Sequence, residues 1–290
     1  MKIALLSTHP GLIENKRIRE VVEDLKYEFQ FVDLTNFGYE ITDNKLNVPG
    51  ITDLVADVAI VRGIFLSLKP ISEAVDELRK RGTKVFDNSL LTHQYSINKI
   101  TDILKLSKAG IPTPDTYYHR SFDGYTKAAQ RIGYPVIVKL TRAGKGAGIY
   151  KMNDKQELEE FIVRMSEQGY VGSSYIMQEF FDYEHDLRML VIGGRIYSMK
   201  RTPREGDFRA NFSLGGSVEL FKPDEETQQL ALDALKAIDM TVGGVDVLIR
   251  KDGKKVVLEV NHTAGFVGME KATGENITKK YVEHAIEKAA

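Results

Sequence analysis

Apolar and polar positions alternate along the first 90 residues in a way that separates strands from helices. Short apolar runs of strand length occupy residues 2–7, 29–34, 57–63 and 83–89, and helical periodicity marks residues 14–26 and 71–82. Strands that alternate with helices predict a parallel sheet, and such sheets bind ligands at the carboxyl ends of their strands. Here those ends carry Ser7-Thr8 and Arg62-Gly63.

A long helix is predicted next, from about Leu91 to Lys108. Gly110 and Pro112 follow it in the positions of a C-cap and a helix breaker. Pro112 and Pro114 belong to the segment IPTPD, which predicts a linker between two parts of the molecule.

After the linker, the pattern changes to pairs of strands separated by single helices. Strands are predicted at 134–140, 148–152, 174–180, 186–192 and 195–201, and helices at 155–168 and 223–238. Gly193-Gly194 predicts a two-residue hairpin turn, which would place Asp186 opposite Arg201. The second half is therefore predicted to be an α+β arrangement of antiparallel strands, unlike the first.

The last predicted hairpin, residues 245–261, combines a buried face with an acidic one. If Asp252-Gly253 is a two-residue turn, Lys251 faces Lys254 and Asp246 lies directly opposite Glu259. Like charges in this register repel, but two carboxylates with the nearby amide of Asn261 suit a hard divalent cation. A solvated acidic face is the alternative. The buried face would consist of Val245, Val247, Ile249, Val256, Leu258 and Val260.

Residues 139–151 contain a glycine-rich loop that predicts phosphate binding. Gly144, Gly146 and Gly148 free the backbone to wrap its N–H groups around an anion. A Walker A loop requires Ser or Thr after Gly144-Lys145, where the chain has Gly146, and a dinucleotide fingerprint requires a helix where a strand is predicted. A loop that closes over phosphates between two strands remains, with an ordinary glycine-rich turn as the alternative.

Composition and charge exclude several classes of protein. The chain of 290 residues has 42% hydrophobic and 28% charged residues, which is ordinary globular composition. It contains no cysteine, which excludes disulfides and thiolate chemistry. A net charge of −1 argues against direct nucleic-acid binding. The N-terminal apolar run is too short for a signal peptide and no segment is long enough to cross a membrane, so we expect a cytoplasmic protein without a membrane partner.

Taken in order, these features resemble the ATP-grasp superfamily, and three strings resemble its RimK-type branch. The strings are EGDFRAN at 205–211 with Gly215-Gly216 after it, VGGVDVL at 242–248, and EVNHTAGFVGMEKATGENI at 259–277. The resemblance covers nearly the whole chain. It implies an N-terminal Rossmann-like pre-ATP-grasp domain at 1–95, a central lobe with the phosphate loop at 96–175, and a C-terminal lobe with a metal site at 176–290.

The resemblance also implies a role for each matching residue. ATP binding is implied for Lys99, Lys139, Gly144, Lys145, Gly146, Gly148, Gln178, Glu179, Phe180, Asp186, Arg209, Ala210 and Asn211. Substrate binding is implied for Asn211, Ser213, Gly215 and Gly216, and catalysis for Arg188 and Arg209. Asp246, Glu259 and Asn261 would hold Mg²⁺, with Mn²⁺ as a variant. For Asp186 a plain salt bridge to Arg201 is the alternative, and for His262 a strand-capping role is favoured over orienting an amine.

The implied reaction is ATP-dependent ligation of an amino acid to a carboxylate through an acylphosphate. L-Glutamate is the favoured amino acid, although Ser213-Leu214 stands where glutamate-adding members carry an arginine before Gly215-Gly216. Asn261-His262-Thr263 looks more like the lysine- and arginine-biosynthesis members, the LysX branch. The acceptor is left open between a protein C-terminus, a carrier protein and a small cofactor, and a homo-oligomer is implied.

Two other classes compete with this interpretation. A non-catalytic ATP-binding regulatory module would share the fold, but loss of the metal pair would be its expected mark, and Asp246, Glu259 and Asn261 are intact. A P-loop ATPase is disfavoured because the loop lacks the required Ser or Thr.

Overall fold

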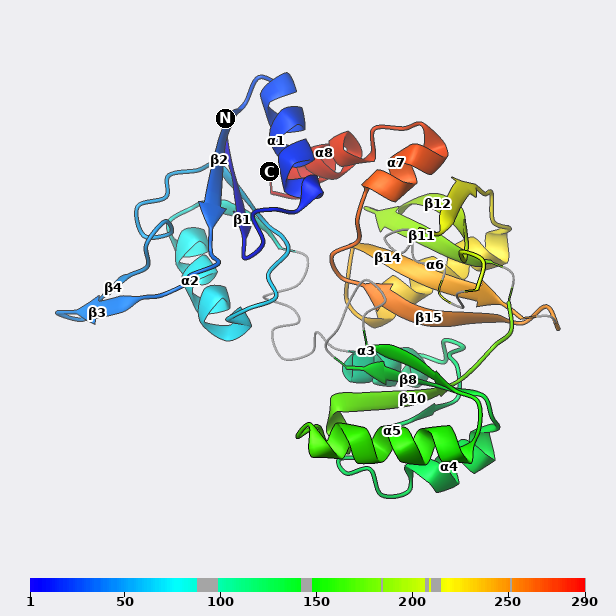
Figure 1. Ribbon diagram of the computed structural model, residues 1–290. Coiled ribbons are helices and arrows are strands. Elements are labelled where there is room, and N and C mark those ends of the chain that lie inside the picture. Colours follow the sequence, from blue (N-terminus) through cyan, green and yellow to red (C-terminus); the bar gives the residue numbers. More distant parts are fainter. Residues whose placement is uncertain are drawn as a thin grey trace.

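The computed structural model describes residues 1–87, 99–141, 148–183, 185–206, 209, 215–250 and 252–289. These residues form three larger sheets and one isolated two-stranded ribbon (Figure 1). A parallel sheet has the strand order β2-β1-β5-β6, a four-stranded antiparallel sheet has the order β7-β10-β8-β9, and a five-stranded antiparallel sheet has the order β13-β12-β11-β14-β15. The predicted parallel first part and antiparallel second part are therefore confirmed.

The parallel sheet is covered on both faces, which explains its almost continuous apolar strands. It consists of β1 (Lys2–Ser7), β2 (Glu28–Asp33), β5 (Val58–Val61) and β6 (Lys84–Asp87). Ala4 and Leu6 pack with α2 (Leu68–Lys80). Ile3 and Leu5 pack with α1 (Ile13–Asp24) and also with α8 (Ile277–Ala289), so the C-terminal helix completes the core of the N-terminal sheet.

The central antiparallel sheet carries the phosphate-loop strands. It contains β7 (Thr116–Tyr117), β8 (Val136–Leu140), β9 (Ile149–Met152) and β10 (Tyr175–Glu179). Its core packs against α4 (Tyr125–Ile132) and α5 (Lys155–Glu167), which lie together on one side of the sheet (Figure 1). The short 3₁₀ helix η1 (Gly172–Ser174) leads into β10.

The five-stranded sheet has one apolar face that packs against helices. Its strands are β11 (Asp186–Ile192), β12 (Arg195–Thr202), β13 (Ser217–Leu220), β14 (Val242–Ile249) and β15 (Lys255–Asn261). Leu187, Met189, Val245 and Val247 form a buried cluster with α6 (Glu225–Ala237) and with Leu106 of α3 (Lys99–Lys108). Gly193-Gly194 joins β11 to β12 in the predicted register, with both glycines at positive φ.

The β14–β15 hairpin confirms one part of its prediction and corrects another. Arg250 and Lys254 are bonded across a loop of three residues, so the expected two-residue turn is wrong. A bulge between Asp246 and Val247 then restores the register, because Val247 pairs with Val257 whereas Asp246 pairs with Glu259. The carboxylates are therefore opposite each other as predicted.

The bulge also changes which residues of β15 face the helices. Val257 and Val260 lie in the cluster with Val245 and Val247. Val256 and Leu258 lie on the other face, with Leu248 and Phe181, so their predicted place beside Val245 is wrong. The physical reason is that one extra residue in a strand moves the following side chains to the opposite face.

Several elements had no prediction from the sequence. They are β3 (Glu40–Thr42) and β4 (Lys45–Asn47), which form an exposed ribbon, the short strands β7 and β13, the 3₁₀ helix η1, the helix α4, and α7 (Val267–Thr273) and α8 at the C-terminus. The helix predicted at 91–108 is present as α3 from Lys99, and residues 88–98 lie outside the described residues. Within the described ranges, no helix is long and apolar enough to cross a membrane.

Candidate active site

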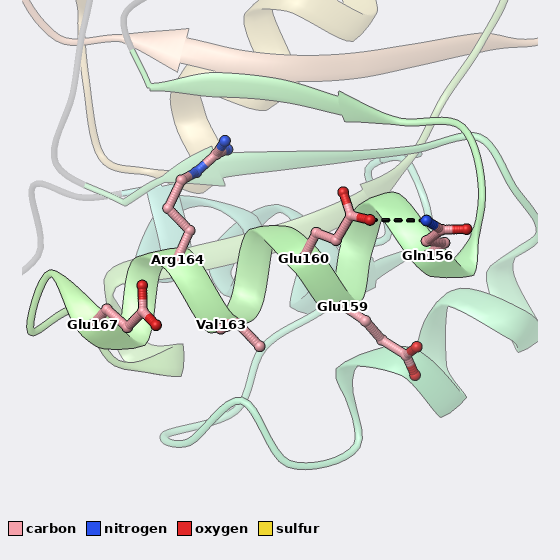
Figure 2. A pocket seen from close by; sticks show the side chains of 6 residues that line it. All are labelled: Gln156, Glu159, Glu160, Val163, Arg164 and Glu167. Atoms are coloured by element: carbon pink, nitrogen blue, oxygen red, sulfur yellow. Dashed lines mark hydrogen bonds between the residues drawn. The ribbon is translucent and has the colours of Figure 1, made fainter.

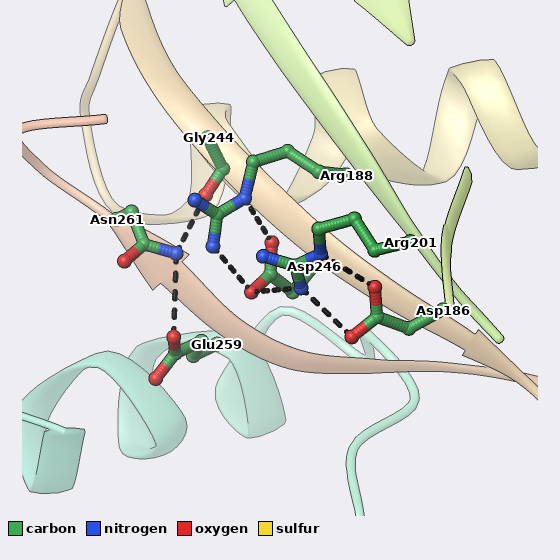
Figure 3. A network of polar contacts seen from close by, with 7 residues as sticks. All are labelled: Asp186, Arg188, Arg201, Gly244, Asp246, Glu259 and Asn261. Atoms are coloured by element: carbon green, nitrogen blue, oxygen red, sulfur yellow. Dashed lines mark hydrogen bonds and ion pairs between the residues drawn. The ribbon is translucent and has the colours of Figure 1, made fainter. Parts of the chain in front are cut away.

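The polar face of the five-stranded sheet gathers six charged or amide side chains from four strands (Figure 3). Side chains two residues apart share a face of a strand, so β11 contributes Asp186 and Arg188 together. Arg188 pairs in register with Asp246 of β14, and Asp246 pairs with Glu259 of β15. The predicted catalytic arginine and the predicted metal carboxylates therefore lie in one row across the sheet.

Asp246 is held by two guanidinium groups. Arg188 Nε donates to Asp246 Oδ1 and Arg188 Nη2 to Asp246 Oδ2, both at 2.6 Å. Arg201 Nη2 also donates to Asp246 Oδ2, at 2.8 Å. This fork geometry is the strongest form of carboxylate pairing in proteins. It also means that the repulsion expected between Asp246 and Glu259 is offset inside the protein itself.

Arg201 connects Asp246 to Asp186. Its Nε donates to Asp186 Oδ1 at 2.6 Å and its Nη2 to Asp186 Oδ2 at 2.8 Å, and both residues are buried. The salt bridge foreseen for Asp186 is thus present, with both carboxylate oxygens engaged. A nucleotide contact through the same carboxylate stays a prediction.

Burial and charge act in opposite directions on this network. Burial raises the pKa of Asp246, but the charges and hydrogen bonds of Arg188 and Arg201 outweigh it, and the net pKa is lowered. Burial also raises the pKa of Asp186, with Arg201 opposing it. Burial alone would lower the pKa of Arg201, but the carboxylates of Asp246 and Asp186 raise it by more. The net pKa is raised, so this guanidinium keeps its charge. Asp246 is therefore an ionised carboxylate in a buried position.

Glu259 and Asn261 complete the candidate cation site. Asn261 Nδ2 donates to Glu259 Oε1 at 3.4 Å and to the Gly244 carbonyl at 3.5 Å. Asp246 accepts three hydrogen bonds on two oxygens, which leaves one lone pair on Oδ1. The described residues contain no cluster of three His, Cys, Asp or Glu side chains able to hold a metal. Two carboxylates and an amide oxygen instead fit Mg²⁺, which completes its shell with phosphates and water.

The two predicted nucleotide lysines lie next to this carboxylate row. The Lys99 backbone N–H donates to the Thr141 carbonyl at 3.4 Å, which brings the start of α3 to the end of β8. Burial lowers the pKa of Lys139, opposed by the charges of Glu259 and Asp246, while Lys99 lowers it further. The directions of these effects fit a lysine that lies near two carboxylates and a second lysine.

Gln178, Glu179 and Phe180, for which ATP binding is implied, lie at or just after the end of β10 in the central sheet. Gln178 is buried in β10 and its Nε2 donates to Thr116 Oγ1 at 3.0 Å. The carboxylate of Glu179 lies 3.5 Å from Arg250 Nη1, and Lys151 Nζ lies 4.0 Å from the centre of the Phe180 ring. The side chains of this segment therefore contact the protein, and ATP binding by Gln178, Glu179 and Phe180 stays a prediction.

His262 bonds to Asp102 of α3. The distance from its Nε2 to Asp102 Oδ2 is 3.0 Å, and both side chains are buried. This contact ties the end of β15 to α3. It supports the structural role that was favoured for His262 over orienting an amine.

Other predicted residues lie partly outside the described structure. Gly144, Lys145, Gly146, Ala210, Asn211 and Ser213 are outside the described residues. Gly148 is described, and it has positive φ and lies so close to Leu140 that a Cβ would be 2.4 Å from that side chain. Arg209 is half-buried, and Gly215 and Gly216 precede β13 directly. Their proposed contacts with nucleotide or substrate stay predictions.

Sequence reasoning missed the double role of Arg201 and the pairing of Arg188 with Asp246. Arg201 could be placed opposite Asp186 by the glycine turn, but β11 and β14 are separated by some 50 residues, so no local signal places Arg188 beside Asp246.

The hollow in Figure 2 has no part in this site. It lies on the outer face of α5, away from the carboxylate row, and is lined by exposed side chains including Glu159 and Glu167.

The architecture is that of ATP-grasp ligases. The ATP-grasp ligase PsnB, solved with a phosphomimetic variant of a minimal precursor, Mg and ADP, superposes with a TM-score of 0.77 at 19% identity, over 99% of this chain and 98% of that chain. The RimK domain ATP-grasp protein of Sphaerobacter thermophilus superposes with a TM-score of 0.74 at 19% identity, over 98% and 99%.

The sequence identifies the branch. Residues 96–285 match the RimK-like ATP-grasp domain, and the chain belongs to that family. A protein of Teredinibacter turnerae named "probable alpha-L-glutamate ligase" is 32% identical over 299 residues, covering 100% of this chain and 96% of that protein. A protein of Pseudoalteromonas atlantica named "probable alpha-L-glutamate ligase 2" is 30% identical over 297 residues, with the same coverage. The chain is an ADP-forming carbon–nitrogen ligase.

Proposed function

We propose that this protein joins L-glutamate to an acceptor carboxylate in an ATP-dependent reaction. An oxygen of the acceptor carboxylate attacks the γ-phosphorus of ATP, which forms an acylphosphate and releases ADP. The amine of glutamate then attacks the acyl carbon, phosphate leaves, and an amide remains with loss of the amine proton. Glutamate is supported by the names of relatives about one-third identical to this chain over its full length.

The observation that carries the proposal is the row formed by Arg188, Asp246 and Glu259 on three neighbouring strands. In the proposed reaction, Arg188 and Lys139 would stabilise the negative charge of the transferred phosphoryl group and of the tetrahedral intermediate. No side-chain nucleophile is required, because the acceptor carboxylate is itself phosphorylated.

The chain's own residues would divide the work as follows. Lys99 and Lys139 would bind the nucleotide phosphates, and Arg188 and Arg209 would stabilise the transferred group. Asp246, Glu259 and Asn261 would hold a divalent cation, which neutralises phosphate charge when bound. The buried surroundings of Asp246 would exclude water from this region, which favours transfer of the acyl group to an amine over hydrolysis.

A polypeptide is the first acceptor to test among the three predicted. PsnB, which has the same fold, was solved with precursor peptide PsnA2 and AMPPNP. A peptide acceptor fits a reaction at a free carboxylate, whether at a C-terminus or on an acidic side chain.

The test is to incubate the purified protein with ATP, Mg²⁺, ¹⁴C-labelled glutamate and a cell extract, and to separate labelled macromolecules from labelled small molecules. ATP-dependent label in protein is the expected result, and the modified peptide would identify the acceptor. Label in a small molecule would show that the protein is a ligase whose acceptor is a small cofactor and not a polypeptide. Absence of label with glutamate, together with label when lysine replaces it, would overturn the choice of amino acid.

A further inference from the structure

The carboxyl edge of the N-terminal parallel sheet is where a ligand would be expected from the fold alone. In the structure the polar groups at this edge form hydrogen bonds with the protein's own backbone. Thr8 Oγ1 donates to the Gly63 carbonyl at 3.0 Å and accepts from the Phe65 N–H at 3.0 Å. Ser7 Oγ accepts from the His9 N–H at 3.1 Å. These hydroxyls shape the turn after β5, which sets the direction of the neighbouring Arg62.

Arg62 leaves this edge and reaches a loop of the C-terminal half. The loop consists of residues 263–266 and is separated from the candidate metal ligand Asn261 by His262 alone. Arg62 is buried, its Nη2 donates to the Ala264 carbonyl, and its guanidinium lies 4.3 Å from the centre of the Phe266 ring and 5.2 Å from that of Tyr281. Arg62 Nε makes no hydrogen bond to any described residue, so the carbonyl and the two rings hold the guanidinium.

The loop of residues 263–266 packs on β14, the strand that carries Asp246. A Cβ at Gly244 would lie 2.9 Å from Ala264 Cβ and 3.6 Å from Arg188 Cδ, so the loop and the arginine both pack on this glycine. Gly244 is two residues before Asp246, and its carbonyl accepts from Asn261 Nδ2 at 3.5 Å. Movement of Ala264 would therefore reach Asn261 and Gly244 directly.

A second contact from the N-terminal part restrains the same loop. Glu14 Oε1 of α1 accepts from the Phe266 N–H at 3.3 Å. A Cβ at Gly265 would lie 2.9 Å from Glu14 Oε1, so the backbone passes close to this carboxylate. The loop is consequently held by α1 on one side and by Arg62 on the other.

We propose that Arg62 is a positioning residue for the metal ligands: through Ala264 it sets the place of Asn261 beside Glu259 and Asp246. This inference rests on the proposed function, because it concerns the cation site of that function. A purely structural Arg62 would stabilise the protein without changing how strongly a divalent cation tightens nucleotide binding.

The test measures the dissociation constant of ADP by titration calorimetry, with Mg²⁺ and with EDTA, in the full-length protein. The ratio of the two constants reports the cation site apart from turnover. Arg62→Met keeps much of the side-chain volume and removes the donor and the charge. We expect Mg²⁺ to tighten ADP binding by Arg62→Met about tenfold less, or weaker still, than it tightens ADP binding by the wild-type protein. This is the range seen when groups supporting metal ligands are removed. ADP binding in EDTA should stay near the wild-type value.

Arg17→Gln is the matched control. Arg17 lies on α1 and pairs with Glu270 at 2.8 Å, so it joins the same two parts of the molecule without touching residues 263–266. We expect Arg17→Gln to lower the unfolding temperature and to keep the wild-type ratio. Hydrogen exchange at the Phe266 amide should speed up in Arg62→Met more than in Arg17→Gln.

Arg62→Lys and Phe266→Leu keep the test decisive if Arg62→Met fails to fold. Lysine retains the charge and one donor and should lose less of the gain, and leucine removes the aromatic face but keeps an apolar side chain. Wild-type ratios in the folded Arg62 and Phe266 variants would overturn the inference and leave the proposed function standing. A wild-type protein whose ADP affinity is the same in Mg²⁺ and EDTA would overturn the proposed function, and the inference with it.

Discussion

The carboxyl edge of the parallel sheet and the polar face of the five-stranded sheet both gather polar residues, but they use them differently. At the parallel edge, Ser7 and Thr8 bond to neighbouring backbone and Arg62 bonds to Ala264. On the five-stranded sheet, Asp246 is paired by Arg188 and Arg201 and still keeps a lone pair beside Glu259 and Asn261. We therefore expect a ligand at the polar face of the five-stranded sheet, where the partners of Asp246 leave a lone pair free, and not at the edge of the parallel sheet, where the hydroxyls bond to backbone.

The largest effect is expected on activity at Asp246. Asp246→Asn should lower the rate of Mg²⁺-dependent ADP formation by about 100-fold or more, since residues that only support metal ligands already cost about 10–100-fold when changed. The rate is measured with glutamate and the identified acceptor. Asp252→Asn, in the exposed loop of the same hairpin, is the control and should retain the wild-type rate. Equal rates in the two variants would refute the assignment of Asp246.

The largest effect on stability is expected at Arg201. Arg201→Met would leave Asp186 and Asp246 buried without their shared cation, which should lower the free energy of unfolding by about 3–5 kcal/mol. Arg250→Met removes two ion pairs of 3.5 Å and a stacking contact on the Phe181 ring, all made by a partly exposed arginine, and should cost about 1 kcal/mol or less. Urea unfolding of both variants makes the comparison. Equal losses would show that the network contributes no more than a surface pair.

Asp246→Asn should also destabilise the protein, against the expectation from the sequence alone. Removing one of two facing carboxylates would relieve a repulsion if they were unpaired, but Asp246 accepts three charge-assisted bonds. We expect a loss of about 2 kcal/mol for Asp246→Asn, the cost of bonds to a charged group, and a smaller one for Glu259→Gln. Unfolding midpoints in urea, measured without metal for the wild-type protein and both variants, would show these losses. A more stable Asp246→Asn would indicate that repulsion dominates.

A smaller effect is expected at the N-terminal edge. Thr8→Val removes the hydrogen bonds that Oγ1 makes with the Gly63 carbonyl, the Phe65 N–H and His9 Nδ1, and the loss should be about 1–3 kcal/mol in the free energy of unfolding. Because Thr8 serves the turn after β5, ADP affinity in EDTA should stay at the wild-type value. A clear loss of that affinity would place a ligand at this edge after all.

The smallest effect is a pH dependence at His284 of α8. Burial lowers the pKa of His284, so the unfolded chain takes up a proton more readily than the folded one. Stability contributed here should therefore fall as pH drops below about 6.5 and level off below the folded pKa. His284→Gln should remove that part of the slope in unfolding midpoints measured from pH 8 to 5. An unchanged slope would mean that the helix docks equally well with a charged side chain.

Much of the candidate site followed from local sequence patterns. The period of two along strands and the Gly193-Gly194 turn placed Asp186 opposite Arg201. The hairpin pattern placed Asp246 opposite Glu259, although the loop has three residues and a bulge compensates for it. The division into domains at 95 and 175, and the nucleotide and substrate contacts, stay predictions.

The amino-acid sequence by itself determined most of the strands and helices, the β11–β12 register, the Asp246–Glu259 pair and the family, because turn chemistry and side-chain period act over a few residues. Only the tertiary structure decided that Arg188 pairs with Asp246, that Arg201 bridges Asp186 and Asp246, and that Arg62 reaches the loop after Asn261. These contacts join segments tens to hundreds of residues apart. Their geometry depends on how whole sheets and helices pack, which no local pattern specifies.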